Sequence, residues 1–502
     1  MGKSVKKAPK SSGKKRFSIE NDTFFDNDKK RRRNFEDDNI ESSDEDEYGE
    51  LKGGEEAEEE EVETAAEVRK RIAEAHLEKL RKIKDEQDKR EVSDDDEERE
   101  RDREGERDTW VANVLQQEQL EDSGRVRRLI ASRVQKPEVT EGFRVLVKHR
   151  QSVTAVALSE DDLKGFSASK DGTIVQWDIE SGKSEKFKWP SDEVLKSHGL
   201  KDPQGRAVKH SKHVLALAVS SDGRYLATGG LDRHIHLWDT RSREHIQAFT
   251  GHKGPVSCLT FRQGTSELFS GSFDRTIKVW NADDRAYITT LFGHQSEVLT
   301  IDCLRKERIL TVGRDRTMHL WKVPEESQLI YRASASSLEC CCFISNDEFL
   351  SGSDDGSIEQ WSVLRKKPVH IIKNAHALQT LDKLEHSENT RQSNGHKEDG
   401  IIKNPCLSAH SWVGSVSVCR NSDLASSGAG NGAIRLWEIE RECKGLRPLF
   451  ELPLVGFVNS LAFAKSGKFL VAAVGQEPRL GRWGRVSAAR NGVALHSLQL
   501  AD

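Results

Sequence analysis

A tryptophan that recurs beyond residue 141 constrains the fold of this chain more than any other feature. Its successive spacings are 61, 42, 41, 40, 76 and 46 residues. Each repeat holds four short alternating segments separated by turn residues, as in PVSCLTF, ELFSGS, TIKVW and YITTL, which is the pattern of four short β-strands. Repeats of this length are single structural units that bury their apolar surface against their neighbours. The recurring residues are Trp177, Trp238, Trp280, Trp321, Trp361, Trp437 and Trp483.

The number of repeats predicts the architecture. One four-stranded sheet cannot cover both of its faces, so sheets of this kind stack radially around an axis and close into a ring. We therefore expect an all-β fold, a seven-bladed β-propeller over residues 141–502, preceded by a disordered charged N-terminal tail with one or more helices. The two longest spacings predict insertions near residues 189–209 and 374–410. Polar loops of that length are either functional or disordered.

Closure of the ring depends on the segment that completes the last blade. Residues 142–149 (GFRVLVKH) have the pattern of a fourth strand but precede the first repeat. The last repeat shows three strands that end near Arg485. We expect the N-terminal strand to complete the last blade, with residues 493–500 (VALHSLQL) as the competing segment.

A set of polar residues accompanies the tryptophans at fixed spacing. An acidic residue lies six positions before the tryptophan, a hydroxyl residue four positions before that, and in four repeats a histidine 21 or 22 positions before the acidic residue. The last two repeats depart from this pattern, with Asn431 and Glu477 at the acidic position and Ala473 at the hydroxyl position of the seventh. The network comprises His149, Ser167, Asp171, Trp177, His210, Thr228, Asp232, Trp238, His252, Ser270, Asp274, Trp280, His294, Thr311, Asp315, Trp321, Ser351, Asp355 and Trp361.

These residue types can hydrogen-bond to one another inside a blade. The aspartate can accept bonds from backbone amides of a tight turn and from the histidine, which in turn reaches the hydroxyl group and the indole. Buried polar groups left without partners would each cost about 1–3 kcal/mol, so we interpret these sets as structural and not catalytic. With Gly251-His252 and Gly293-His294 as GH pairs, and Trp177-Asp178 and Trp238-Asp239 as WD pairs, the chain resembles the WD-repeat family.

The N-terminal 140 residues differ from the repeats in composition. They hold 31 Lys and Arg against 41 Asp and Glu, whereas the rest of the chain holds 48 against 43. A charged segment with few aromatic residues cannot bury enough apolar surface to offset its chain entropy. We predict disorder over residues 1–61, a charged helix over 62–90, an acidic disordered linker over 91–108, and short helices leading into the propeller over 109–140.

Two basic clusters and an acidic serine tract in this tail indicate nuclear targeting. Basic clusters suit the acidic groove of an import receptor, and serines followed by acidic residues suit phosphorylation by an acid-directed kinase. The combination is typical of nucleolar proteins, so we expect a location in the nucleus and nucleolus. The targeting residues are Lys14, Lys15, Arg16, Lys29, Lys30, Arg31, Arg32 and Arg33, and the serines are Ser42 and Ser43.

No motif predicts catalysis, a cofactor or a metal site. The segment GAGNG at 428–432 precedes no helix, and SGKS at 181–184 lacks the first glycine of a phosphate loop, because that position is Trp177. The eight cysteines show no CxxC spacing, and the adjacent thiols of residues 340–342 point to alternate faces of a strand. Without an 18-residue apolar stretch or a secretory signal, we expect a soluble intracellular protein with no membrane span and no small-molecule substrate.

Basic residues beside the structural aspartates form the first candidate binding surface. The turns between the second and third strands of adjacent blades share one face of a propeller, so these residues could form an arc of positive charge. Arginine suits phosphate oxygens and stacks on unpaired bases, which predicts contact with RNA; in the alternative the charges pair with the neighbouring aspartates. The arc comprises Lys170, Arg233, Arg275, Arg314 and Arg316, and a second patch on the last blade comprises Arg479, Arg482, Arg485 and Arg490.

Several longer segments resemble one family among WD-repeat proteins, the U3 small nucleolar RNA-associated family. They are FTGH (249–252), TLFGHQ (290–295), PEESQL (324–329), the block PLVGFVNSLAFAKSGKFLVAAVGQEPRLGRW (453–483), and ETAAEVRKRIAEAHLEKLR (63–81). The resemblance implies a non-catalytic RNA-binding component of the U3 ribonucleoprotein in the nucleolus, required for pre-rRNA cleavage toward 18S rRNA. It implies binding to the box B/C region of U3 snoRNA beside a kink-turn-binding protein and other small-subunit processome proteins.

Two other classes remain as alternatives. The segment Trp238-Asp239-Thr240-Arg241 fits the WDxR pattern of substrate receptors of cullin-type ubiquitin ligases. A WD40 scaffold that binds histones or other peptides is the third hypothesis. RNA affinity that falls steeply with salt separates the first hypothesis from the other two.

Overall fold

The computed structural model describes residue 78 and residues 109–117, 119–120, 126–136, 142–199, 212–334, 337–376, 411–440 and 445–501. All of them belong to one compact unit, Leu77–Asp502. Within the predicted helix 62–90 only Glu78 is described, and it is helical. Both basic clusters, Ser42 and Ser43, the linker 91–108 and His210 lie outside the described residues.

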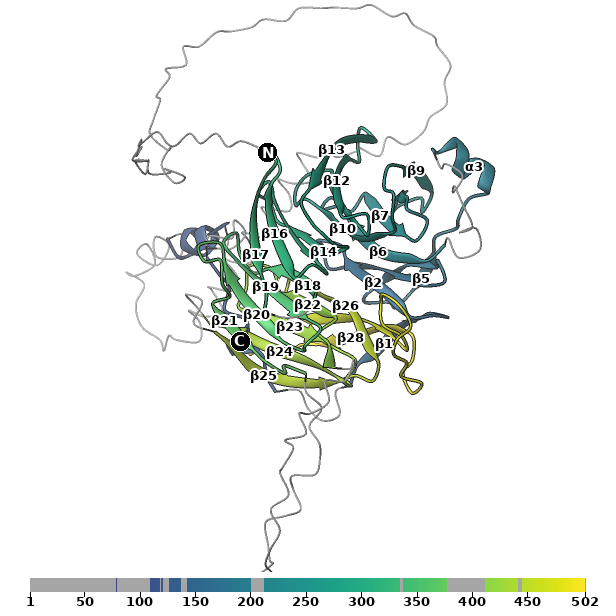
Figure 1. Ribbon diagram of the computed structural model, residues 1–502. Helices are drawn as coiled ribbons and strands as arrows, with labels where there is room; N and C mark the ends of the chain where they lie inside the picture. The colour runs from purple at the N-terminus through teal and green to yellow at the C-terminus, as the bar shows by residue number, and fades with distance from the viewer. Residues whose placement is uncertain are drawn as a thin grey trace, which may run out of the picture. The chain divides into compact units, whose positions relative to one another are not determined.

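The described residues form seven four-stranded antiparallel sheets (Figure 1). Blade one comprises β2 (Val153–Leu158), β3 (Lys164–Ser169), β4 (Ile174–Asp178) and β5 (Ser184–Lys186). Blade two comprises β6 (Val214–Val219), β7 (Tyr225–Gly230), β8 (Ile235–Asp239) and β9 (His245–Phe249). Blade three comprises β10 (Val256–Phe261), β11 (Glu267–Ser272), β12 (Thr276–Asn281) and β13 (Ala286–Phe292).

The remaining blades follow in chain order. Blade four comprises β14 (Val298–Cys303), β15 (Arg308–Gly313), β16 (Thr317–Lys322) and β17 (Ser327–Arg332). Blade five comprises β18 (Leu338–Phe343), β19 (Glu348–Ser353), β20 (Ile358–Ser362) and β21 (His370–Ile372). Blade six comprises β22 (Ser415–Val418), β23 (Leu424–Gly428), β24 (Ala433–Ile439) and β25 (Leu446–Pro453). Blade seven comprises β26 (Phe457–Phe463), β27 (Phe469–Gly475), β28 (Gly492–Ser497) and β1 (Arg144–Lys148).

The blades close into a ring, which confirms the seven-bladed propeller. The first strand of each blade contacts the first strand of the next, from β2 through β6, β10, β14, β18 and β22 to β26, and β26 contacts β2. In blades two and three, close approach of the next blade requires glycine near the end of the second strand. A Cβ on Gly271 of β11 would lie 2.8 Å from the Val298 side chain of the next blade, and one on Gly229 would lie 2.6 Å from Val256.

The N-terminal strand completes the last blade, as expected. β1 pairs antiparallel with β28, with Val147 opposite Val493, so the first and last strands of the propeller lie side by side (Figure 1). The sheet order is β1-β28-β27-β26. Residues 492–497 therefore do not compete with β1 for the position of the outermost strand, because they form the third strand of the blade.

The prediction that the third strand of blade seven ends near Arg485 is wrong. Trp483 lies in a long loop, residues 476–491, between β27 and β28, and is 46% exposed. The partner of Leu470 in β27 is His496, whereas the equivalent residue of blade three, Leu268, pairs with Trp280. The length of the loop after β27 places Trp483 at the repeat spacing, although this residue does not belong to a strand.

A segment that precedes the propeller is fixed to blades six and seven. Residues 109–117 are helical, and residues 126–136 hold a short 3-10 helix, Ala131–Arg133, between two bridges to Ser422 and Leu500. The Asp423 carboxylate accepts bonds from the amides of Ile130 and Ala131 at 2.7 and 2.9 Å. The carboxylate satisfies amides at the helix start that have no backbone partner.

The first insertion carries helix α3 (Asp192–Ser197), with Ser191 as its N-cap. It also carries Trp189, whose ring meets that of Trp238 edge-on at 4.8 Å. Of the second insertion, residues 377–410 lie outside the described residues. No helix in the described part of the chain is long and apolar enough to cross a membrane.

Candidate nucleic-acid interface

The polar network of blade three shows how each turn on one face is held. His252 Nδ1 lies 2.9 Å from Asp274 Oδ2, and His252 Nε2 lies 2.8 Å from Ser270 Oγ. The Trp280 indole donates to the same hydroxyl oxygen at 2.9 Å. A neutral imidazole satisfies all three contacts when Nδ1–H donates to the carboxylate and Nε2 accepts from the hydroxyl group. Hydrogen bonds from His252 and Thr276 hold the pKa of Asp274 well below its usual range despite partial burial.

Other blades repeat the network with substitutions. In blade four His294, Asp315, Thr311 and Trp321 are connected in the same way. Tryptophan donates to the hydroxyl residue at 3.0 Å in blade two, at 2.9 Å in blade five and at 2.8 Å in blade six. In blade one His149 reaches Ser167 at 3.0 Å, but the Trp177 indole finds no hydrogen-bond partner in the described part of the chain.

The network of blade six contains a histidine that the sequence analysis missed. His376 Nε2 lies 2.7 Å from Ser427 Oγ, and its Nδ1 lies 3.3 Å from Asn431 Oδ1. The 55 residues that separate His376 from Asn431 exceed the usual 21 or 22 because the second insertion lies between them. The available signal was the pair Ala375-His376 directly after the fourth strand of blade five.

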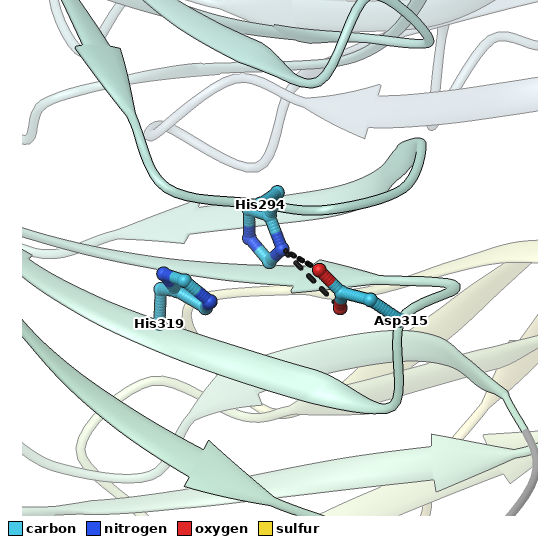
Figure 2. Close-up of side chains that lie close together, drawn as sticks. All are labelled: His294, Asp315 and His319. Atoms are coloured by element: carbon cyan, nitrogen blue, oxygen red, sulfur yellow. Dashed lines mark hydrogen bonds and ion pairs between the residues drawn. The ribbon is translucent and has the colours of Figure 1, made fainter. Parts of the chain in front are cut away.

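Figure 2 shows the residues of the described part that come closest to a metal-binding arrangement, His294, Asp315 and His319, whose ligand atoms lie within 4.8 Å of one another. Both His319 nitrogens have protein partners, Gln328 Oε1 at 2.6 Å and Thr317 Oγ1 at 3.0 Å. His294 donates toward Asp315 as part of the blade network. These contacts account for the arrangement as a structural element of blade four.

We call the face formed by the turns between second and third strands the top face. Three arginines occupy the same position of this turn in adjacent blades, with φ of 68° at Arg233, 69° at Arg275 and 62° at Arg316. This left-handed conformation favours glycine and costs other residues about 1–2 kcal/mol. The equivalent residues of blades one, five and six are glycines with φ of 84°, 77° and 93°, namely Gly172, Gly356 and Gly432.

The four predicted arginines of the arc are exposed. Arg233, Arg275, Arg314 and Arg316 all present their side chains to solvent. The neighbouring aspartates are occupied by the blade network: Asp274 Oδ1 accepts from the Thr276 amide and Asp315 Oδ1 from the Thr317 amide, each at 3.0 Å. Among the described residues, these four arginines have no ion pair within 4.0 Å, so pairing with the adjacent aspartates does not account for them.

Lys170 and Arg479, in contrast, act inside the molecule. Lys170 is only 4% exposed and donates to Glu477 at 3.3 Å and to the Gly481 carbonyl at 2.8 Å, and burial lowers its pKa. Arg479 donates to the carbonyl oxygens of Ser257 and Leu299, both at 2.9 Å. The two cations fix the loop 476–491, so Lys170 does not join the exposed arc and Arg479 does not join the exposed patch on the last blade.

The other basic residues of that loop are exposed beside an aromatic cluster. Arg482, Arg485 and Arg490 reach solvent, and Arg482 Nε lies 3.6 Å from Glu477. Trp483 packs against Trp412 with 4.5 Å between ring centroids. The loop thus adds cations and an exposed indole to the top face.

The WDxR segment lies at the other end of blade two. Arg241 follows β8 in the turn to β9, and its amide donates to Asp239 Oδ1 at 2.7 Å. The top-face turns lie at the opposite end of these strands, so Arg241 belongs to a different surface from the arginine arc.

Comparison with known proteins gives matches over the repeats and over most of the chain. The family described as WD domain, G-beta repeat, matches residues 142–178, 203–239, 243–281, 285–322, 326–362 and 403–438. A U3 snoRNP-associated protein-like protein of Arabidopsis thaliana is 56% identical over 492 residues, which cover 97% of each chain. The U3 small nucleolar RNA-interacting protein 2 of Mus musculus is 38% identical and covers 87% of this chain and 83% of its own.

Two further matches extend the comparison to yeast and to a solved structure. Ribosomal RNA-processing protein 9 of Saccharomyces cerevisiae is 26% identical and covers 76% of this chain and 78% of its own. A structure of U3-55K is 40% identical, covers 72% of this chain and all of that chain, and superposes with a TM-score of 0.60.

Proposed function

Because the chain belongs to the family of U3 snoRNP-associated WD40 proteins, we propose that it binds U3 small nucleolar RNA and acts in pre-rRNA processing in the nucleolus. The relatives reported above are named for the U3 ribonucleoprotein, for interaction with U3 RNA or for ribosomal RNA processing. The chain is a non-catalytic propeller scaffold, in keeping with a relative named for interaction with U3 RNA.

The observation that supports RNA binding best is the set of three arginines in left-handed turns. Glycine would adopt this conformation without strain, and three other blades use it. The turn therefore does not require Arg233, Arg275 or Arg316. Exposed arginines that form no ion pair with any described residue, repeated on three adjacent blades of one face, suit a phosphate backbone that follows the ring.

The finer parts of the proposal rest on the family resemblance. We place the box B/C region of U3 snoRNA on the top face, with a kink-turn-binding protein beside it and other processome proteins around it. Processing toward 18S rRNA follows from that assembly. The basic clusters of the N-terminal tail would bind an import receptor and bring the chain to the nucleus.

The glycine turns of the other blades define the test. Replacing Arg233, Arg275 and Arg316 together by glycine removes three charges while keeping the backbone conformation that the turn adopts. Binding of a labelled U3 box B/C fragment, measured with the kink-turn-binding protein present, should weaken. The slope of log affinity against log salt should become smaller by about 2, because each phosphate contact contributes roughly 0.7 to 0.9.

The matched control is Arg285→Gly. Arg285 also has a left-handed φ, 52°, but lies in the turn between β12 and β13 at the other end of blade three. It should leave RNA binding unchanged. Wild-type affinity and salt dependence in the triple variant would reject the arc as the site. A wild-type chain that binds no RNA but captures a cullin adaptor, with capture lost in Arg241→Ala, would reject the function.

A further inference from the structure

A cavity of about 740 Å³ opens at the rim of blade three, between the loop that enters the blade and the loop that leaves it. We propose that this cavity binds unpaired nucleotides of single-stranded RNA, with Phe292 as the surface on which a base stacks. The proposal rests on the proposed RNA-binding function and adds a second contact, next to the arc, that shares Arg275 with it. The volume lies within the range of roughly 300–1,000 Å³ that ligand sites usually have.

Phe292 is a large apolar side chain that the protein leaves exposed at the cavity. It ends β13, pairs across the sheet with Thr276, and is 71% exposed. The equivalent position of blade two, directly before Gly251-His252, is Thr250. The fold therefore does not need an aromatic residue there. A single exposed apolar side chain is ordinary by itself, so the significance of Phe292 comes from the cavity and the cations around its ring.

The charge of the cavity complements nucleic acid. Its wall holds the cations Lys253, Arg275 and Lys278 and a single carboxylate, Asp274. That carboxylate is occupied, because Oδ2 accepts from the Lys253 amide at 2.8 Å and Oδ1 accepts from Thr276 Oγ1 at 2.6 Å. Three cations around an exposed ring combine phosphate attraction with a stacking surface, which is how proteins bind single strands.

A second aromatic residue lies next to the same wall. Tyr287 is 51% exposed, and Lys278 Nζ lies 5.0 Å above the centroid of its ring. The same ammonium group donates to Thr290 Oγ1 at 2.7 Å, and Thr290 Oγ1 lies 2.7 Å from the Tyr287 hydroxyl group. Lys278 is thus held in one place beside the cavity, so less side-chain entropy is lost when it meets a phosphate group.

Both the chemistry and the position favour unpaired RNA over a duplex. Stacking on Phe292 requires a base whose face is free, which a paired stem does not offer. Arg275 belongs both to the arc of the top face and to the wall of this cavity. A strand that follows the arc past blade three could therefore continue into the cavity.

The test compares a single-stranded oligouridylate of about ten nucleotides, a length within the usual range for such sites, with an RNA duplex of the same length. Phe292→Ala should weaken binding of the single strand roughly 5- to 100-fold, as loss of one base–aromatic stack does. Phe292→Trp should restore it. Leu364→Ala is the control, because Leu364 is 79% exposed in blade five, away from the cavity. With 5-iodouridine in the strand, the photo-crosslinked peptide should contain Phe292.

The outcomes separate this inference from the function on which it rests. If U3 RNA binding depends on Arg233, Arg275 and Arg316 but Phe292→Ala binds the oligouridylate like wild type, the stacking site is rejected and the function stands. If the wild-type chain binds neither RNA, both are rejected. If polyglutamate binds in a Phe292-dependent manner and the oligouridylate does not, the cavity serves an acidic protein segment, which also overturns the proposal.

Discussion

Three buried histidines of the blades, His149, His319 and His376, are held neutral by their surroundings. Burial lowers the pKa of His376 from 6.5 to about 4, and the nearby Arg435 charge acts in the same direction. Burial likewise lowers the pKa of His149 and His319 to about 4. In the unfolded chain these imidazoles would titrate near 6.5, so the unfolded state takes up protons first as the pH falls.

The stability of the propeller should therefore decrease in mild acid. The histidine contribution is fully present above pH 6.5 and is lost as the pH falls toward 4. Each buried histidine contributes up to about 1.4 kcal/mol per pH unit within that window. Chemical denaturation at pH 7, 6 and 5 measures the slope. His376→Gln, which cannot be protonated, should give a shallower slope, and an unchanged slope would contradict this account.

At the scale of elements, the outer strand β1 closes the ring through a single buried side chain, Val147. Val147 is 6% exposed and packs in the core between blades seven and one, whereas Val145 on the same strand is 43% exposed. The pairing of β1 with β28 joins segments far apart in the chain. Such a closure joins the two ends of the propeller and makes the ring cooperative, while the outer strand of each blade remains a short edge.

The two valines provide a matched pair of variants. Val147→Asp should destabilise the propeller by several kcal/mol, because it places an unpaired charge in an apolar core. Val145→Asp should change the free energy of unfolding by less than about 0.5 kcal/mol, as exposed positions do. Thermal unfolding of both variants measures the difference. Equal effects would mean that β1 does not hold the ring closed.

The elements also show which predictions were possible. The strands, the blade number and the place of β1 followed from the repeat spacing and from the alternation of apolar and polar residues. Neighbouring residues of a strand point to opposite faces, so a short stretch of sequence is enough to show this alternation. The third strand of blade seven did not follow. Ala473 and Glu477 already set the repeat of Trp483 apart from the others, but only the pairing of β28 with β27 showed that His496 takes the place of the blade tryptophan.

At the scale of the whole molecule, Arg479 joins parts of the ring that lie apart in the chain. It reaches from the loop of blade seven to backbone carbonyls of β10 in blade three and β14 in blade four. Its guanidinium group makes both bonds at once because its donors form a planar fork. The loop 476–491 is thereby held over the centre of the top face.

Arg479→Lys should loosen this loop, because one ammonium group does not reproduce the planar fork that reaches both carbonyls. Hydrogen exchange of the amides in residues 476–491 should become faster, while that of the β-strands stays the same. Arg482→Lys serves as the control, since Arg482 is exposed and pairs only with Glu477 at 3.6 Å among the described residues. Unchanged exchange in the loop of Arg479→Lys would show that other contacts hold it.

The sequence alone determined the seven-bladed propeller and the networks of blades three and four, because strand alternation and hydrogen-bonding types repeat at short, regular spacing. It also placed Arg233, Arg275, Arg314 and Arg316 on one face. Only the tertiary structure decided that Lys170 and Arg479 are used internally, that His376 completes blade six, and that Phe292 stands in a basic cavity. The burial of a side chain and its pairing with a residue of a distant blade both depend on closure of the ring. A local stretch of sequence therefore does not show which side chains remain exposed to solvent after closure.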